Sequence, residues 1–521
     1  MMMLLAPLTD HLNRSSGSLM EDLNRMGPVL AVLVTAGVIV VVDLVIPRER
    51  VKWVSAGLAL AGLAAAALWL VLLAATDQWA SYFSDSMSFD DFSVFFGFLF
   101  LAVSAAVVVA SLDYVERFGK HQAEFFALML ISTAGMMLLA SSRDLVAIFV
   151  ALELTSISQF ILAGFLRDDR GSEAAIKYLL VGAVSSAVLL YGMAFLYGLS
   201  GTTRLLTTDG APSILDAIAN GEGSRSAIIL AMVFVAAGFG FKMATVPFQM
   251  WTPDVYEGAP TPVAAFLSVG SKTAAFAVLL RVFVEGFGVE SFVADNWKLM
   301  FAVLAAVSMT IGNVMALRQT NVRRMLGYSS IAQAGNFLVG VAALSITTEP
   351  GGDGAGVITR ELTGGTGVLF FLATYTFTNL GAFFAVMAIS NRTGSDEIAD
   401  YAGIGGRAAI PAAVLTFCLL SLTGLPPTAG FWAKLFIFNS AVQADLVWLV
   451  IIAVLNTVVS AFYYLGVARQ MYTGTPSSDE EIRSSPAMQA MLLTAAAGVA
   501  AFFIYPYPLI EAAQRAVEGL G

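Results

Sequence analysis

The chain has 521 residues, of which 58% are hydrophobic and 12% are charged, and its formal net charge is -10 at pH 7. The acidic balance excludes the basic surface that nucleic acid requires. Many apolar runs contain about 20 residues, enough to cross a hydrocarbon core of ~30 Å. These runs are apolar all round, whereas the helices of a large soluble protein carry charged outer faces. The sequence therefore predicts an all-α polytopic membrane protein in the lipid bilayer.

Residues 1–27 form a polar leader that lacks the apolar core of a cleavable signal peptide, so the first apolar run is expected to direct insertion. About fourteen runs bounded by Gly, Pro or charge follow and predict a single transmembrane domain over 28–505. The runs lie near 28–46, 53–75, 92–111, 124–140, 144–166, 173–198, 226–248, 262–284, 298–317, 323–345, 367–390, 408–441, 446–468 and 487–505. Residues 506–521 remain as a short C-terminal tail.

Lys and Arg in the connections set the expected orientation. One set of connections collects most of them, including Arg48, Arg167 and Arg323, and the other set has fewer over longer loops. The positive-inside rule makes the first side cytoplasmic. An even number of spans then places both termini on the outer side.

Two of these runs are interrupted. The seventh reaches Lys242 and then meets Pro247, and the twelfth contains LTGLPPTAGF at 422–431. Unpaired backbone at membrane depth persists only where protein or water satisfies it. Matched discontinuous helices are typical of inverted-repeat transporters. We expect discontinuous helices seven and twelve within two inverted repeats, about 124–284 and 298–468, with simple proline kinks as the alternative.

Four ionisable side chains lie inside apolar runs: Glu153, Lys242, Lys272 and Lys434. Each costs roughly 2.5–3.5 kcal/mol at the centre of a membrane helix, and such residues generally serve a function. Together they indicate a row of protonatable sites. The alternative is a static ion pair between Glu153 and Lys242 that only holds helices together.

Other polar residues are harder to assign from the sequence. Lys177 lies about 7 Å into its run at 1.5 Å per residue, so it either joins the row or extends its ammonium to the cytoplasmic surface. Arg281, at the outer end of the eighth run, is expected to reach the outer surface, and Asp90 is expected at the interface. Gln333 and Asn336 either hold water for a proton relay or join helices.

No cluster of Cys and His with metal-ligand spacing is present in the sequence, which contains one Cys and two His. Cys418 lies inside an apolar run and has no second Cys with which to form a disulfide within the chain. We therefore expect no haem, iron–sulfur cluster or zinc ion on this chain.

Five stretches together carry a family resemblance: ALELTSIS (151–158), AAIKYLLVGAVSSAVLLYG (174–192), FKMATVPFQMWTPDVYEGAPTPVAAFLSVGSK (241–272), RRMLGYSSIAQAG (323–335) and LTGLPPTAGFWAKLFIF (422–438). With them the chain resembles the antiporter-like membrane subunits of proton-pumping NADH:quinone oxidoreductase, complex I. The resemblance covers essentially all of the apolar runs.

The resemblance implies a proton-translocating subunit of a bacterial inner-membrane complex, with a relay formed by Glu153, Lys177, Lys242, Lys272 and Lys434. It implies that Glu153 pairs with Lys242, that Lys177 and Lys272 are connecting lysines, and that Lys434 is the terminal lysine toward the next pump. Lys272 replaces the histidine usual in subunits L and M, and Lys434 replaces the glutamate of subunit M. The resemblance is therefore to the family member nearest the hydrophilic arm.

The implied partners are the antiporter-like subunits M and L, the small subunits K, J and A, and indirectly the hydrophilic arm. Other chains of the complex would carry FMN and iron–sulfur clusters and bind quinone. Two alternatives remain open from the sequence: a subunit of a Mrp-type cation/proton antiporter or of a ferredoxin- or hydrogenase-linked complex, and a scaffold that does not pump.

Overall fold

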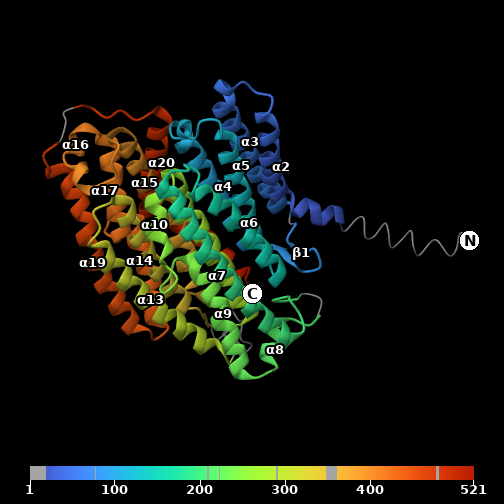
Figure 1. Ribbon diagram of the computed structural model, residues 1–521. Helices are drawn as coiled ribbons and strands as arrows, with labels where there is room; N and C mark the ends of the chain where they lie inside the picture. The colour runs from blue at the N-terminus through green and yellow to red at the C-terminus, as the bar shows by residue number, and fades with distance from the viewer. Residues whose placement is uncertain are drawn as a thin grey trace, which may run out of the picture.

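The computed structural model describes residues 19–76, 78–207, 211–221, 223–288, 292–347, 361–476 and 480–520. Residues 1–18 of the predicted leader lie outside this part of the chain. The described residues form a bundle of long helices, in which the N-terminal helices lie at one end and the C-terminal helices at the other (Figure 1). The all-helical membrane fold expected from the sequence is confirmed.

The first half of the chain begins with a short helix, Leu19–Arg25, which is bent by 71° against α2. The following helices are α2 Gly27–Asp43, α3 Arg48–Ala75, α4 Asp91–Ala110, α5 Gln122–Ser141, α6 Leu145–Ala163, α7 Asp169–Ser200, α8 Ile214–Ala219, α9 Arg225–Met243 and α10 Trp251–Gly258. Two short 3₁₀ turns, η1 Ser111–Asp113 and η2 Val115–Phe118, follow α4. Strands β1 Ala80–Tyr82 and β2 Met87–Phe89 pair antiparallel, with Ala80 opposite Phe89.

The second half begins with one long helical unit that contains two π-helical turns: α11 Thr261–Phe266, η3 Leu267–Ser271, α12 Lys272–Arg281 and η4 Val282–Gly286. The remaining helices are α13 Ala294–Ala316, α14 Val322–Ala342, α15 Gly365–Thr393, η5 Ile398–Tyr401, α16 Ile404–Arg407, α17 Ala409–Thr423, α18 Ala429–Gln443, α19 Val447–Thr473, α20 Pro486–Ile504 and α21 Tyr507–Glu518. Strands β3 Ser345–Thr347 and β4 Glu361–Thr363 pair antiparallel, with Ser345 opposite Thr363.

Polar side chains start several of the long helices. Asp144 accepts hydrogen bonds from the backbone of Val146 and Ala147 at the start of α6, and Asn321 accepts from Arg323 and Arg324 at the start of α14. These bonds satisfy amide groups that have no partner within the helix. The short polar connections therefore fix where each apolar run becomes helical.

Burial separates a central layer from the periphery. The unit Thr261–Gly286 is buried throughout, and α15 and α5 are nearly so. In the apolar stretches of α3, α7, α19 and α20, only a third or fewer of the residues are fully buried by the chain itself. The exposed residues on the outer helices are mainly apolar, as expected for a surface that faces lipid or other membrane chains. The central unit lies where the two halves of the chain meet.

Eleven helices in the described residues are long and apolar enough to cross a membrane, or twelve if the bent N-terminal pair is one span. The sequence predicts about fourteen. The helix α14 and the pair α17 and α18 are not among the eleven, although the chain has a helical unit at both places. The described part of the short C-terminal tail forms the helix α21, which packs against α15 and α4.

Candidate functional site

Lys242 lies in the last turn of α9 and is only 5% exposed. Its ammonium donates to Gln159 Oε1 at 3.3 Å and to Tyr178 OH at 3.4 Å, and it lies 5.3–5.5 Å from three aromatic ring centres. The helix ends at Met243, and the C-terminal end of a helix carries partial negative charge. The sequence predicts an interruption after Lys242. Because α9 ends there, the negative end of its helix dipole lies in the same turn as this buried lysine.

Gln159 of α6 is the centre of this cluster and is fully buried. Its Oε1 accepts from Tyr178 OH at 3.0 Å and from Ser271 Oγ at 3.0 Å, in addition to Lys242. Its amide donates to Ser132 Oγ at 3.1 Å. A single side chain thus connects helices α5, α6, α7 and α9 with the central unit.

Glu153 lies on the same helix as Gln159, but its carboxylate accepts from Ser186 Oγ at 2.5 Å. No ion pair within 4.0 Å joins Glu153 and Lys242. The direct pairing expected between them is therefore not formed in this structure, because each group has another partner. The two remain close enough to interact electrostatically.

Lys177 belongs to a different cluster. Its ammonium contacts Asp254 Oδ2 at 2.6 Å and Glu173 Oε1 at 2.7 Å, and its side chain is 43% exposed. Asp254 also binds Arg324, at 2.7 Å. The structure therefore places Lys177 in a group of surface ion pairs, separate from the buried network around Lys242.

Lys272 follows the π-helical turn η3 and is 2% exposed. Its ammonium donates to the hydroxyl and the carbonyl of Ser330 on α14. The hydroxyl of Ser330 in turn lies 3.3 Å from Tyr256 OH and 3.3 Å from Tyr375 OH. The adjacent residue Ser271 contacts Gln159, so two consecutive side chains of the central unit reach the two halves of the chain.

Lys434 of α18 is buried at the second interruption. Its ammonium donates to the carbonyl of Thr423, the last residue of α17, at 2.9 Å, and to Thr457 Oγ1 at 3.3 Å. Gly424 allows the break because its φ of 89° lies in the left-handed region. As with Lys242, the cation lies at the negative end of a half-helix.

A polar stripe lies between Lys272 and Lys434. Gln333 donates to the carbonyl of Leu422 at 2.9 Å, and Asn336 donates to Gln333 Oε1 at 3.1 Å. Ser329 bonds to Tyr464 OH. Of the two side chains expected either to hold water or to join helices, Gln333 thus contacts a carbonyl in the last turn of α17, and Asn336 contacts Gln333.

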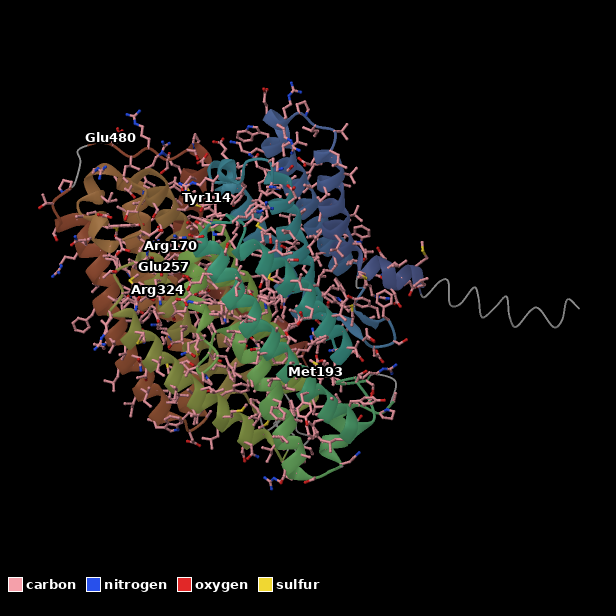
Figure 2. The ribbon with its side chains drawn as sticks, viewed as in Figure 1. Tyr114, Arg170, Met193, Glu257, Arg324 and Glu480 are labelled. Atoms are coloured by element: carbon pink, nitrogen blue, oxygen red, sulfur yellow. The ribbon has the colours of Figure 1, made fainter. Side chains whose placement is uncertain are left out.

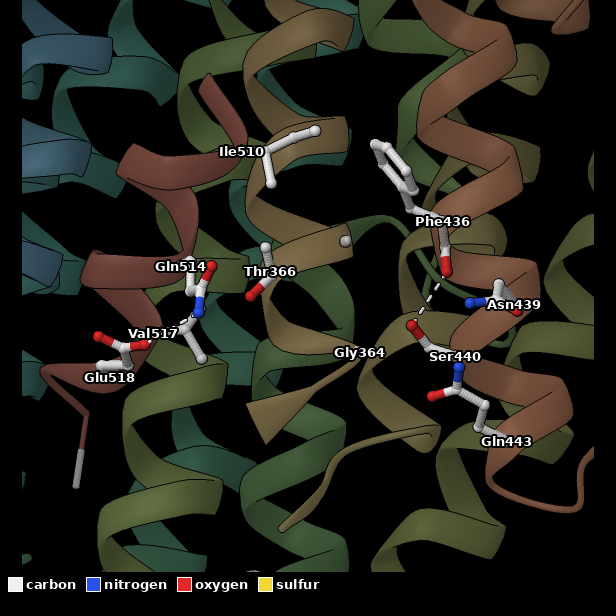
Figure 3. A pocket seen from close by; sticks show the side chains of 11 residues that line it. Gly364, Thr366, Phe436, Asn439, Ser440, Gln443, Ile510, Gln514, Val517 and Glu518 are labelled. Carbon is white, nitrogen blue, oxygen red and sulfur yellow. Dashed lines mark hydrogen bonds between the residues drawn. The ribbon is translucent and has the colours of Figure 1, made fainter. Parts of the chain in front are cut away.

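A crevice of about 240 Å³, lined by both polar and apolar side chains, lies at the far end of α18. Figure 3 shows Thr366 at the start of α15, Ser440 on α18, and Gln514 and Glu518 on α21 around it. Ser440 Oγ bonds to the carbonyl of Phe436 at 2.9 Å. The C-terminal helix therefore forms one wall of a cavity next to the helix that carries Lys434.

Arg281 does not reach the outer surface, contrary to expectation, and is fully buried. It contacts Asp90 at 3.0 Å and Glu285 at 2.7 Å, and Arg143 contacts the same two carboxylates at 3.5 and 3.0 Å. Asp90, expected at the interface, has a side chain that is 13% exposed. The expectation was wrong because the sequence did not reveal that two carboxylates and a second arginine surround Arg281.

The members of the buried network that were not singled out from the sequence include Gln159, Tyr178 and Ser330. The signal for Gln159 is an amide six residues after Glu153 in the same predicted helix. Tyr178 directly follows Lys177, and a lysine inside an apolar run is a stronger sequence signal than a tyrosine. Many apolar runs contain serines and tyrosines, so only the contacts in the structure identify Tyr178 and Ser330 as members of the network.

Residues 142–460 match the family model described as NADH:quinone oxidoreductase/Mrp antiporter, TM. The chain is 40% identical over 499 residues to NADH-quinone oxidoreductase subunit N of Dehalococcoides mccartyi, covering 94% of this chain and 98% of the relative. It is 44% identical over 428 residues to subunit N of Moorella thermoacetica, covering 82% and 84%.

A chain of respiratory complex I from Thermus thermophilus with bound aureothin is 29% identical, with a TM-score of 0.75 over 94% of this chain and 99% of that chain. A chain of the Mrp complex from Dietzia is 21% identical, with a TM-score of 0.78 over 96% and 97%, and shows the shared fold. The long matches to subunit N and the matching family model agree. The chain belongs to the NADH-quinone oxidoreductase subunit N family of antiporter-like membrane subunits.

Proposed function

We propose that this chain moves protons across the membrane as a subunit of NADH:quinone oxidoreductase, driven by quinone reduction elsewhere in the complex. The observation that carries the proposal is the burial of three lysines, Lys242, Lys272 and Lys434. Each has its ammonium on oxygen acceptors and forms no salt bridge with a carboxylate in the part of the chain that the structure describes. A buried lysine without a carboxylate partner is held near the balance between its charged and neutral forms. Such groups suit the uptake and release of protons.

In the proposed relay, Glu153 controls the first lysine. A carboxylate that approaches a buried ammonium favours the charged form, and its withdrawal favours release of a proton. Ser186 holds Glu153 away from Lys242 in this structure. A change of partner from Ser186 to Lys242 would therefore switch the charge state of the lysine.

The connection to the second half runs through Gln159 and Ser271, which link Lys242 to the residue before Lys272. Lys272 then contacts Ser330, and the stripe of Gln333 and Asn336 continues toward the carbonyls beside Lys434. Water between these polar groups would complete the path. Moving one elementary charge across a membrane potential of 100 mV takes about 2.3 kcal/mol. A pKa change of two units corresponds to about 2.7 kcal/mol, so a change of this size is comparable to the free energy of moving one proton.

We also propose the full fourteen-span arrangement with two inverted repeats over about 124–284 and 298–468. In each repeat the fourth helical unit is in two parts, α9 with α10 and α17 with α18, and a lysine lies at each break. The helix α14 has 21 residues, enough to cross the membrane, but its polar stripe lowers its hydropathy. The divided pair α17 and α18 also lies outside the eleven apolar helices, whereas α9 of unit seven is long enough to be among them.

We also propose where the chain lies in the membrane and which subunits surround it. The chain lies in a bacterial inner membrane with both termini on the periplasmic side, beside the antiporter-like subunits M and L and the small subunits K, J and A. FMN, the iron–sulfur clusters and the quinone site belong to other chains. The Mrp-type antiporter shares the fold at 21% identity, whereas the relatives at 40% and 44% identity described above are subunit N, which favours the oxidoreductase.

Replacement of Glu153 by Gln tests the proposed function. The amide keeps the size of the carboxylate and can still accept from Ser186, but it carries no charge. The complex should assemble with its flavin and iron–sulfur subunits in mild detergent, while proton pumping in vesicles should fall about tenfold or more. A tenfold loss corresponds to about 1.4 kcal/mol of coupling free energy.

The matched control is Glu124→Gln. Glu124 is a half-exposed carboxylate beside His121 at the start of α5. It should pump normally. Normal pumping by Glu153→Gln would contradict the control of the relay by this carboxylate. Purification with only membrane-bound partners would instead support an antiporter assembly.

A further inference from the structure

The short helix α10, Trp251–Gly258, lies between α7 and α14 and carries a small cluster of ion pairs on its surface side. Asp254 binds Lys177 of α7 at 2.6 Å and Arg324 of α14 at 2.7 Å. Arg324 also binds Glu257 at 2.8 Å. Arg170, Glu257 and Arg324 lie together near the middle of the bundle in Figure 2. One carboxylate thus joins α10 to helices from both halves of the chain.

The other side of α10 contacts both buried lysine clusters. The indole of Trp251 stacks on Tyr178 at a ring distance of 4.4 Å and donates to the carbonyl of Phe241 at 3.0 Å. Tyr178 is a hydrogen-bond partner of Lys242. At the other end of α10, Tyr256 OH lies 3.3 Å from the hydroxyl of Ser330, which binds Lys272.

The helix is too short to hold this position by itself. It has 8 residues, and isolated helices shorter than about 12 residues are marginal in water. Its ends are irregular chain, which follows the break at Met243 and precedes α11. Packing and the two ion pairs of Asp254 therefore fix its position between the lysines.

A solvated charged surface is the ordinary interpretation of such ion pairs, since a single exposed pair contributes only about 0–1 kcal/mol. The arrangement here differs in two ways. The carboxylate of Asp254 is 25% exposed and is shared between two cations. These cations come from different helices, so the bonds restrain three elements with respect to one another.

We propose that Asp254 is a positioning residue for the relay: by clamping α10 between Lys177 and Arg324, it holds Tyr178 against Lys242 and Tyr256 against Ser330. The inference rests on the proposed proton relay through Lys242 and Lys272. It assigns the surface contact of Lys177 a role in geometry, whether or not this lysine also carries protons.

The test is Asp254→Asn in the assembled complex, compared with Glu173→Gln. Both changes remove a carboxylate from Lys177 at nearly the same distance, 2.6 and 2.7 Å. Glu173 lies on α7 with Lys177, so it does not restrain α10. Asp254→Asn should lower the number of protons pumped per electron several-fold, and Glu173→Gln should leave it unchanged. Equal effects of the two variants would overturn the proposal.

Two further measurements separate positioning from general destabilisation. Amide hydrogen exchange over 251–258 should rise in Asp254→Asn and not in Glu173→Gln. In a Tyr178→Phe background, where the bond of Tyr178 to Lys242 is already lost, Asp254→Asn should add less than its full pumping defect, because only the contact of Tyr256 with Ser330 remains to be disturbed. Unchanged exchange, or pumping losses that add fully, would overturn the proposal.

If Asp254→Asn does not assemble, Arg324→Gln removes the α14 side of the same clamp and should show the same exchange and the same non-additivity. A different result is expected if the proposed relay itself is wrong. In that case the complex with Tyr178→Phe alone pumps normally, whatever the amide hydrogen exchange of α10 shows.

Discussion

At the scale of single residues, lone charges were sufficient to find the lysines but not their partners. Lys242, Lys272 and Lys434 stand out because an ammonium inside an apolar run has few structural explanations. Their acceptors are a glutamine, a tyrosine, a serine, a threonine and backbone carbonyls, which occur throughout such runs. Arg281 shows the opposite error, since its position near the end of a run predicts exposure, whereas Asp90 and Glu285 bury it.

Lys177 gives a prediction at this scale. Lys177→Arg keeps a cation for Asp254 and Glu173 but hardly releases a proton, and Lys177→Ala loses both ion pairs. If the contacts of Lys177 matter more than its proton, the arginine variant should pump close to normally, and the alanine variant should lose roughly fivefold, or about 1 kcal/mol.

The measurement is the proton-to-electron ratio in membrane vesicles. An arginine variant as defective as the alanine variant would show that Lys177 itself releases a proton. Normal pumping by both variants would remove Lys177 from the site.

At the scale of elements, the interruptions were predictable and their consequences were not. Two prolines and a Gly-Pro-rich segment indicate where helices seven and twelve break. The sequence does not show that each break presents a helix end to a lysine, or that the π-helical turn η3 directs Ser271 and Lys272 to opposite halves of the chain. Both follow from packing among elements that are distant in the sequence.

The ion network at the start of α4 gives a prediction at this scale. Burial tends to raise the pKa of Asp90, but the charges of Arg281 and Arg143 outweigh it and hold this pKa below its usual value. The stabilisation from the ionised carboxylate is therefore complete above about pH 4, and it is lost as the pH falls through the lowered pKa.

Asp90→Asn tests this network, because asparagine keeps the helix cap but removes the charge. It leaves two arginines with one carboxylate, and the loss of one partner of a buried pair costs about 3–5 kcal/mol. The variant should unfold at a lower temperature than the parent chain at pH 7 in detergent. The difference should shrink below about pH 4, and a difference that is constant with pH would contradict the assignment to charge.

At the scale of the whole molecule, composition predicted the membrane fold, and the described residues contain eleven or twelve apolar helices of membrane length, fewer than the fourteen that we propose. Helix α14 carries Arg323, Arg324 and a polar stripe, so its mean hydropathy falls although it is buried. The pair α17 and α18 is divided at Gly424. Polar residues and a break therefore distinguish α14 and the pair α17 and α18 from the eleven continuous apolar helices.

Orientation gives a prediction at this scale. Thr320, before α14, and Asp445, between α18 and α19, are both exposed and lie in connections predicted on opposite sides. A cysteine at position 320 should react with an impermeant reagent only from the cytoplasm, and one at position 445 only from outside. The native Cys418 is buried and provides the unreactive background. Labelling of both sites from one side would contradict the fourteen-span arrangement.

The central claim is that Lys242 gains and loses a proton in each cycle. Lys242→Arg tests it most directly, because arginine keeps the buried charge and its donors but hardly deprotonates. Lys242→Ala serves as the comparison that also removes the charge. The arginine variant should assemble better than the alanine variant and still pump poorly, at a proton-to-electron ratio well below that of the parent complex in reconstituted vesicles. A normal ratio for Lys242→Arg would show that proton loss from this lysine is not part of the cycle.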